Sequence, residues 1–265
     1  MDEIAFSLGP LNFYWYGIIM AAAVLSAALI TFWQTRLFHE PAMPIVDLLL
    51  ISVPVGIVFA RMSFVLMDWP LFKGNWAEIF RFWHGGMFFG GALIGAVGIY
   101  MFYTHVFGFP FWRWADILAP GLAFGQAVGQ WASLMTQEGF GFPTSLAWGV
   151  YIDFLYRPSG YEQFDFFHPV FLYESIWNAM MFIVLLAMAY GRVKFNFPKR
   201  NGLVFLLYLF LYASGHLYFD SMRLDGLVSG GLYSSKLICL GVMAVTVLLA
   251  VAREMETSVR SKGKQ

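Results

Sequence analysis

The residues of this chain that are best placed to do chemistry are ionisable side chains near the ends of long apolar stretches. They are Arg61, Glu138, His168, Glu174, His216, Asp220 and Arg223. An ionisable group at the centre of a spanning helix costs about 2.5–3.5 kcal/mol on insertion scales, so each such group is a functional candidate. The set predicts a polar site between helix ends.

Three of these residues have a helical spacing. His216, Asp220 and Arg223 are four and three residues apart, which places them on one face of a continuous helix. We expect that face to look into a bundle. The alternative is a structural ion pair of Asp220 with Arg223 or with Arg61, because buried charges are often simply paired.

The motifs that are missing restrict the chemistry. The sequence has no H-E-x-x-H zinc motif and no G-x-x-x-x-G-K phosphate loop. Its single cysteine, Cys239, cannot form an internal disulfide or a cysteine-rich metal site. We therefore expect no metal and no cofactor, and a nucleophile that is brought by the substrate.

Other conspicuous residues have structural explanations. Asp116 lies near the start of an apolar stretch, where a carboxylate commonly satisfies the free amides of a helix end. A structural role is favoured there over chemistry. Gly121, Gly125 and Gly129 are four residues apart and predict a face against which another helix packs closely.

The elements that position these residues are membrane helices. Hydrophobic residues make up 60% of the 265 residues, charged residues only 12%, and the mean hydropathy is +0.67. About 20 apolar residues span a bilayer. Seven stretches qualify: 13–33, 45–67, 87–107, 114–135, 171–190, 203–219 and 235–252. The sequence predicts an all-α polytopic membrane protein, with 1–265 as a single membrane domain.

Charge gives the orientation. The 16 Lys and Arg balance 16 Asp and Glu, so there is no basic excess for nucleic acid. Between the predicted spans, ten Lys and Arg fall on the side of the carboxyl terminus and five on the other. Because Lys and Arg are retained in the cytoplasm, we expect the carboxyl terminus inside and the amino terminus outside.

The longest stretch between spans, 136–170, then lies outside the membrane as a small extracytoplasmic head. Its aromatic run 148–156 favours a short hairpin.

Ordered motifs along the chain resemble one known family. They are Tyr14–Gly17, Trp83–Met87, Gly91–Gly95, Ala115–Pro120, Phe124–Gly129, Gln137–Gly141, His168–Glu174 and Gly215–Arg223. In this order they are similar to bacterial prolipoprotein diacylglyceryl transferases, over about residues 7 to 250. Any one motif is weak, and the ordered set is specific.

The resemblance implies a multi-pass protein of the bacterial inner membrane with seven spans and a periplasmic head. Members move the diacylglyceryl group of phosphatidylglycerol onto the cysteine thiol of a prolipoprotein signal peptide. The resemblance implies catalytic roles for Glu138, Asp220 and Arg223, and we add His216 as the best available proton acceptor or phosphate contact. It implies substrate-binding roles for Tyr16, Arg61, Gly85, Asp116, Gly141 and Tyr212, and we add Gln130, which stands at a family arginine position.

The chain departs from the family pattern at several positions. Gly90 replaces a motif histidine, Gln130 and His216 replace arginines, Ser133 replaces an asparagine, and Asp220 replaces a glutamate. His216 and His84 can restore part of the lost charge. Alternatives are a member that binds lipid or signal peptide without turnover, a small-molecule transporter, and a structural scaffold.

Overall fold

The computed structural model describes residues 4–9, 11–74, 76–81, 85–195, 200–224 and 232–262. Its contacts divide the chain into two compact units. We call Met1–Phe38 with Ala115–Gln265 the bundle unit, and His39–Trp114 the helix-pair unit. The predictions of one membrane domain and of an extracytoplasmic head stay predictions.

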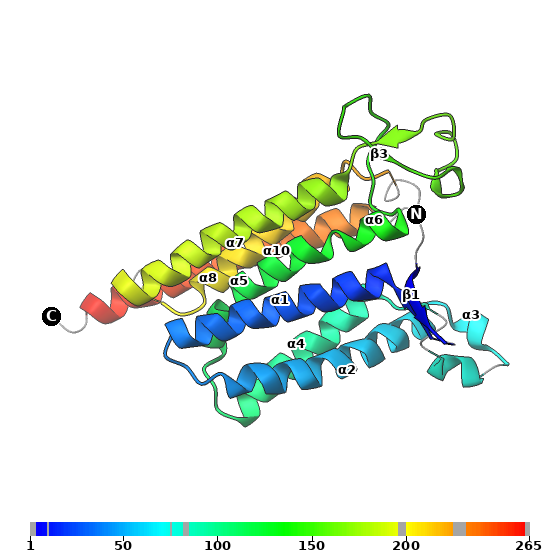
Figure 1. The fold of residues 1–265 in the computed structure, drawn as a ribbon. Coiled ribbons are helices and arrows are strands. Elements are labelled where there is room, and N and C mark those ends of the chain that lie inside the picture. The colour runs from blue at the N-terminus through cyan, green and yellow to red at the C-terminus, as the bar shows by residue number, and fades with distance from the viewer. Residues whose placement is uncertain are drawn as a thin grey trace. The chain divides into compact units, whose positions relative to one another are not determined.

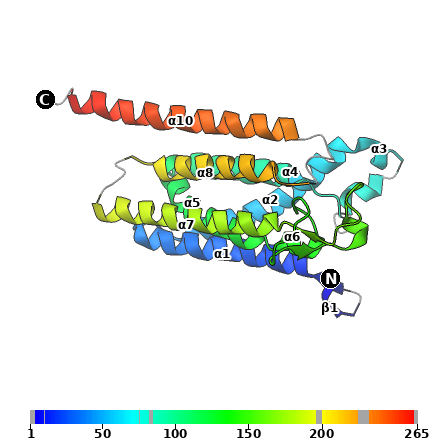
Figure 2. The same cartoon turned by 90° about the horizontal axis from the view of Figure 1, so that it is seen from above.

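The bundle unit is built from long helices that lie side by side (Figures 1 and 2). They are α1 (Trp15–Leu37), α5 (Phe111–Gly129, in this unit from Ala115), the short α6 (Ala132–Thr136), α7 (Val170–Phe195), α8 (Leu203–Asp220) and α10 (Leu232–Lys262). The start of α1 and the end of α10 lie at opposite ends of this unit in both views. The sides of the membrane on which the two termini lie stay a prediction.

Small residues let α5 approach α1. A Cβ added to Gly121 would lie 2.2 Å from Thr31 Oγ1, and one added to Gly125 would lie 2.8 Å from Ala27 Cβ. At Gly129 the nearest atom would be 3.6 Å away, which is an ordinary contact. The predicted packing face is therefore confirmed at its first two glycines.

The helix-pair unit contains α2 (Met43–Met67), the short α3 (Trp69–Phe72), the 3₁₀ helix η1 (Trp76–Phe80) and α4 (Phe89–Val106). Helices α2 and α4 pack closely, since a Cβ on Gly91 would lie 2.5 Å from the Phe59 carbonyl oxygen. The Tyr103 hydroxyl donates to Asp47 Oδ2 at 2.7 Å, which also ties α4 to α2.

Two small sheets lie outside the helices. Strands β1 (Ile4–Leu8) and β2 (Leu11–Tyr14) form an antiparallel hairpin that leads directly into α1. Between α6 and α7, β3 (Val150–Tyr151) pairs antiparallel with β4 (Phe166–Phe167), and the 3₁₀ helix η3 (Phe154–Tyr156) lies between them in sequence. We call residues 139–169 of this segment the head.

The expectation of a hairpin within 148–156 is wrong, because the partner of β3 lies about 16 residues further along the chain. Phe140, Ile152 and Phe167 of the head form a core together with Leu224, which follows α8. The residue pattern of a strand is visible in the sequence, whereas the strand with which it pairs can lie far along the chain and is not indicated by that pattern.

Each predicted span contains a long helix. Among the residues that the structure describes, five helices meet the length and hydropathy needed to cross a membrane: α1, α2, α7, α8 and Lys236–Arg253 within α10. Helix α4 is apolar but shorter, over Gly90–Val106, and α5 ends at Gly129 before the predicted span does. The chain is a mostly helical membrane protein, and the count of seven spans stays a prediction.

Candidate functional site

Two charge pairs lie at the α7 start and the α8 end of the bundle unit. Arg223 Nη2 donates to Glu174 Oε2 at 2.8 Å, and His216 Nδ1 lies 3.0 Å from Asp220 Oδ2. Asp220 thus pairs with His216, and the expected pair of Asp220 with Arg223 or Arg61 is not the one observed. We call these four residues the polar cluster.

Arg223 is positioned by backbone pairing instead of by a helix. Helix α8 ends at Asp220, so the one-face prediction fails for Arg223. Arg223 forms an isolated antiparallel bridge with Gly141. A Cβ on Gly141 would lie 2.9 Å from the Met222 carbonyl oxygen, so this close approach requires glycine.

One hydrogen-bond donor of the Arg223 guanidinium lacks a partner. This donor, Nε, is buried and has no hydrogen-bond partner among the described residues, whereas Nη2 is paired with Glu174. A buried unpaired donor costs about 1–3 kcal/mol, so an anion at this position would be stabilising.

Glu138 lies on the same side of the unit, between α6 and the strand-like segment that pairs with Arg223. It is exposed, and its Oε2 accepts a long hydrogen bond, 3.4 Å, from Thr136 Oγ1. Its neighbour Gly139 packs against the Arg223 guanidinium, at 3.5 Å from an added Cβ. Tyr16, at the start of α1, lies within range of an electrostatic interaction with the Glu138 carboxylate.

A cavity of about 110 Å³ adjoins Glu138. Its lining includes Ser133, Gln137, Asp153 and Phe171. Ser133, which stands at a family asparagine position, therefore lies in the neighbourhood of Glu138. Gln130 follows α5 on the short segment that leads to α6.

An apolar groove of about 410 Å³ lies between α1, α5 and α7 of the same unit. It is lined by Ile18, Ile19, Ala22, Ala127, Val128, Trp131 and Ser175. The Ser175 hydroxyl donates to the Ala127 carbonyl at 2.7 Å and accepts from Trp131 Nε1 at 3.2 Å, so its hydrogen bonds are internal. One residue of its lining, Ser175, directly follows Glu174 on α7. A polar cluster and an apolar groove within one unit suit an amphiphilic ligand.

Tyr212 lies one helical turn before His216 on α8, and the two ring centroids are 5.4 Å apart. The site therefore brings together Glu138, Gly141, Tyr212, His216, Asp220 and Arg223, with Tyr16 near Glu138. Within the described ranges, no three His, Cys, Asp or Glu side chains gather closely enough to hold a metal ion.

Arg61 and Gly85 belong to the helix-pair unit and contact each other. The buried Arg61 guanidinium donates to the Gly85 and Gly86 carbonyls at 2.5 and 3.0 Å. It also donates to the carbonyls of Glu78 and Ile79 at 2.6 and 3.0 Å. Arg61 thus links the end of η1 to the backbone just before α4.

Two further positions of this unit were singled out in the sequence. Gly90 lies at the start of α4, where an added Cβ would meet the Phe88 ring at 2.5 Å. His84 lies outside the described residues.

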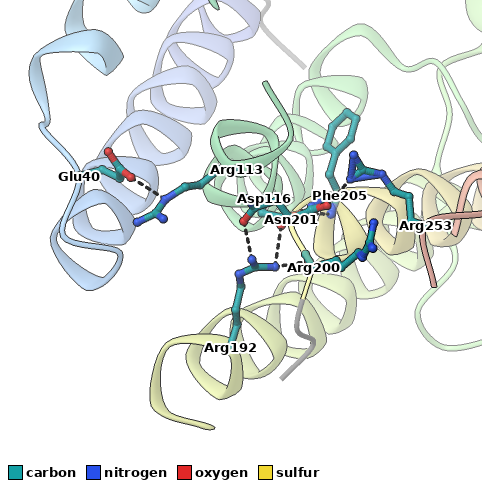
Figure 3. A network of polar contacts seen from close by, with 9 residues as sticks. Glu40, Arg113, Asp116, Arg192, Arg200, Asn201, Phe205 and Arg253 are labelled. Atoms are coloured by element: carbon teal, nitrogen blue, oxygen red, sulfur yellow. Dashed lines mark hydrogen bonds and ion pairs between the residues drawn. The ribbon is translucent and has the colours of Figure 1, made fainter. Parts of the chain in front are cut away.

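Asp116 belongs to a separate network of polar contacts, which Figure 3 shows from close by. It is fully buried, accepts from the Gly202 and Phe205 amides at 2.6 and 2.9 Å, and is 3.3 Å from Arg192 Nη1. Arg192 and Glu174 are 18 residues apart on α7, which is about 27 Å at 1.5 Å per residue. Asp116 is therefore remote from the polar cluster and caps the start of α8.

Two residues of the site are absent from the catalytic and binding sets that the resemblance implies. Glu174 was nevertheless a candidate from the sequence, because an ionisable residue near the end of an apolar helix is costly. Gln137 lay within a listed motif, but residue type alone does not indicate its left-handed backbone conformation.

The fold defines an α-helical membrane protein, and its site combines paired charges with an apolar groove. Residues 3–252 match the family model described as prolipoprotein diacylglyceryl transferase. The chain belongs to this family.

Relatives are similar over nearly their full length. A protein of Listeria innocua named phosphatidylglycerol--prolipoprotein diacylglyceryl transferase is 33% identical over 97% of this chain and 91% of its own. Proteins of the same name from Bacillus cereus and Synechococcus elongatus are 34% and 32% identical, over 96% and 91% of this chain and 92% and 83% of their own.

Proposed function

We propose that this protein transfers the diacylglyceryl group of phosphatidylglycerol to the cysteine thiol of a prolipoprotein signal peptide. Relatives that match almost the whole chain are named for this reaction, and their names support the proposal. The structural observation that carries it is the buried Arg223 Nε, which has no hydrogen-bond partner among the described residues. A mostly apolar groove between α1, α5 and α7 of the same unit adds a surface for acyl chains.

Phosphatidylglycerol matches this arrangement in both of its parts. The phosphate binds Arg223, whose guanidinium is oriented by Glu174. An acyl chain occupies the groove between α1, α5 and α7, whose volume falls in the range of small-molecule sites. Tyr16 and Glu138 border the lipid head group.

In the reaction, the thiol sulfur bonds to the terminal carbon of the diacylglyceryl group. The bond from that carbon to the phosphate oxygen breaks, and its electron pair leaves with glycerol phosphate. His216 takes the thiol proton, and Asp220, near Nδ1, holds the imidazole so that Nε2 is the acceptor. Arg223 stabilises the charge that develops on the phosphate.

Arg61 and Gly85 shape the backbone before α4 within the helix-pair unit. In the bundle unit, Asp116 stabilises the far end of the bundle in this proposal. We further propose seven spans, with the amino terminus and the head outside the cytoplasm and the carboxyl terminus within it.

The test uses the purified protein in nanodiscs that contain phosphatidylglycerol, together with a signal peptide that carries the acceptor cysteine. Mass spectrometry detects the diacylglyceryl thioether and released glycerol phosphate. Arg223→Gln is expected to lower the rate by about 100- to 1,000-fold, as is typical when a charge-stabilising donor is lost. A matched control is Arg157→Gln, which breaks another arginine–carboxylate pair, 2.8 Å from Asp165 in the head.

Equal rates for Arg223→Gln and wild type contradict the assignment of Arg223. Lipid binding without any thioether in the wild-type protein supports the binding-only alternative, in which the substitutions at Gly90, Gln130, Ser133 and His216 have removed catalysis.

A further inference from the structure

Gln137 has an unusual backbone conformation. Its φ and ψ are 52° and 42°, in the left-handed region, where only one other described non-glycine residue, His39, has a positive φ. This region costs a residue with a Cβ about 1–2 kcal/mol relative to the right-handed one. Strain of this kind persists only where the surrounding contacts hold it.

The contact that holds Gln137 comes from the head. The Gln137 side chain is buried, 9% exposed, and its Oε1 accepts the Asp153 backbone N–H at 2.7 Å. The Asp153 side chain in turn caps η3, with Oδ1 accepting the Leu155 N–H at 3.2 Å. The hydrogen bond therefore ties an ordered part of the head to the end of α6.

Glu138 is the next residue, so its position depends on this tie. The Gln137 and Glu138 amides both donate to the Ser133 carbonyl, the second at 3.1 Å. Gly139 also has a positive φ, 65°, and packs against Arg223. Glu138 is thus flanked by two left-handed residues, and a rotation at Gln137 would redirect its side chain.

The same residues border one cavity. Gln137, Glu138 and Asp153 all line the space of about 110 Å³ between α6 and the head. Loss of the Gln137–Asp153 hydrogen bond would let the two walls of this cavity move apart.

We propose that Gln137 is a positioning residue: its side-chain amide binds the Asp153 N–H, holds the head against the end of α6, and thereby fixes the direction of the Glu138 carboxylate. The part of this proposal that concerns turnover rests on the proposed function. The hydrogen bond between Gln137 and Asp153, which we call the tie, does not depend on that function.

Three substitutions separate the tie from the backbone strain. Gln137→Gly removes the acceptor but adopts positive φ freely, so the end of α6 is preserved. Gln137→Asn tolerates the left-handed region but is one methylene too short for a 2.7 Å contact. Gln137→Glu retains an oxygen acceptor of the same reach and serves as the conservative control.

Hydrogen exchange at the Asp153 amide measures the tie. We expect Gln137→Gly and Gln137→Asn to accelerate this exchange about fivefold, the factor that corresponds to one net hydrogen bond. We expect kcat to fall at least about tenfold, as for a misplaced catalytic group, with KM for phosphatidylglycerol nearly unchanged. Gln137→Glu should restore both readouts. A purely structural role would lower the midpoint of thermal unfolding without this separation of kcat from KM.

Unchanged exchange in Gln137→Gly overturns the tie, and faster exchange with unchanged kcat overturns the positioning role. If the wild-type protein shows no transfer, the proposed function fails and a spin label decides the positioning role. The label is attached to Glu138→Cys in a Cys239→Ala background. A label that gains motion when Gln137→Gly is added supports the positioning role, and equal motion with and without Gln137→Gly overturns it.

Discussion

Asp116 offers the sharpest separation of a structural role from a substrate role. Asp116→Ala removes the acceptor for the Gly202 and Phe205 amides and the charge next to Arg192. Loss of one partner of a buried ion pair costs about 3–5 kcal/mol, and loss of a helix cap about 0.5–2 kcal/mol. Arg192 keeps contacts with the Arg200 carbonyl and Asn201, which places the sum at the low end.

We therefore expect Asp116→Ala to lower the free energy of unfolding by about 3 kcal/mol, which is more than 100-fold in the folding equilibrium. Asp116→Asn keeps one acceptor oxygen and should lose about 2 kcal/mol. The matched control is Asp68→Asn, at an exposed acidic residue whose side chain caps no helix, with an expected change of less than about 0.5 kcal/mol.

The assay is reversible unfolding in mixed micelles, followed by circular dichroism, together with phosphatidylglycerol affinity under folding conditions. A double-mutant cycle with Arg192→Met should give a coupling of at least about 1 kcal/mol, because the two side chains are in contact. Unchanged stability of Asp116→Ala with weakened lipid affinity would refute the capping role and return Asp116 to the substrate site.

Three further outcomes follow from the geometry. Arg61→Lys replaces the planar guanidinium that donates to the Gly85 and Gly86 carbonyls, so amide hydrogen exchange in residues 85–88 should become about tenfold faster. Unchanged exchange would contradict this role of the guanidinium. Gly215→Ala places a Cβ 2.3 Å from Trp177 Nε1, so thermal unfolding should show a loss of stability of about 1–3 kcal/mol. The control is Gly129→Ala, whose Cβ has its nearest atom at 3.6 Å and which should be neutral or stabilising. Equal effects at the two glycines would contradict the packing argument. Glu174→Gln weakens the hold on Arg223 and should reduce transfer about tenfold, with no change if Arg223 is oriented by other contacts.

Much of this protein can be predicted from its sequence because hydropathy is a local property. About 20 apolar residues span a bilayer wherever they occur, so the stretches 13–33 and 45–67 predicted α1 and α2 closely. Family membership likewise followed from ordered motifs. Glu138, His216 and Arg223 were recognisable as candidates because charge in an apolar chain is costly.

The partners of these charges were not predictable in the same way. His216, Asp220 and Arg223 have helical spacing, yet α8 ends at Asp220, and the next turn carries Arg223 to Glu174. Where a helix ends depends on contacts made by its last residues, here the pairing of Arg223 with Gly141 from a distant segment.

The sequence by itself determined the class of protein, the helical stretches and the residue types available for chemistry. The tertiary structure decided which charges meet, that Asp116 caps a helix about 27 Å from the polar cluster, and that Gln137 sets the direction of Glu138. Spanning helices follow from transfer of apolar side chains out of water, which each segment can satisfy alone. Ion pairs and strained turns form only when segments far apart in the chain are packed together.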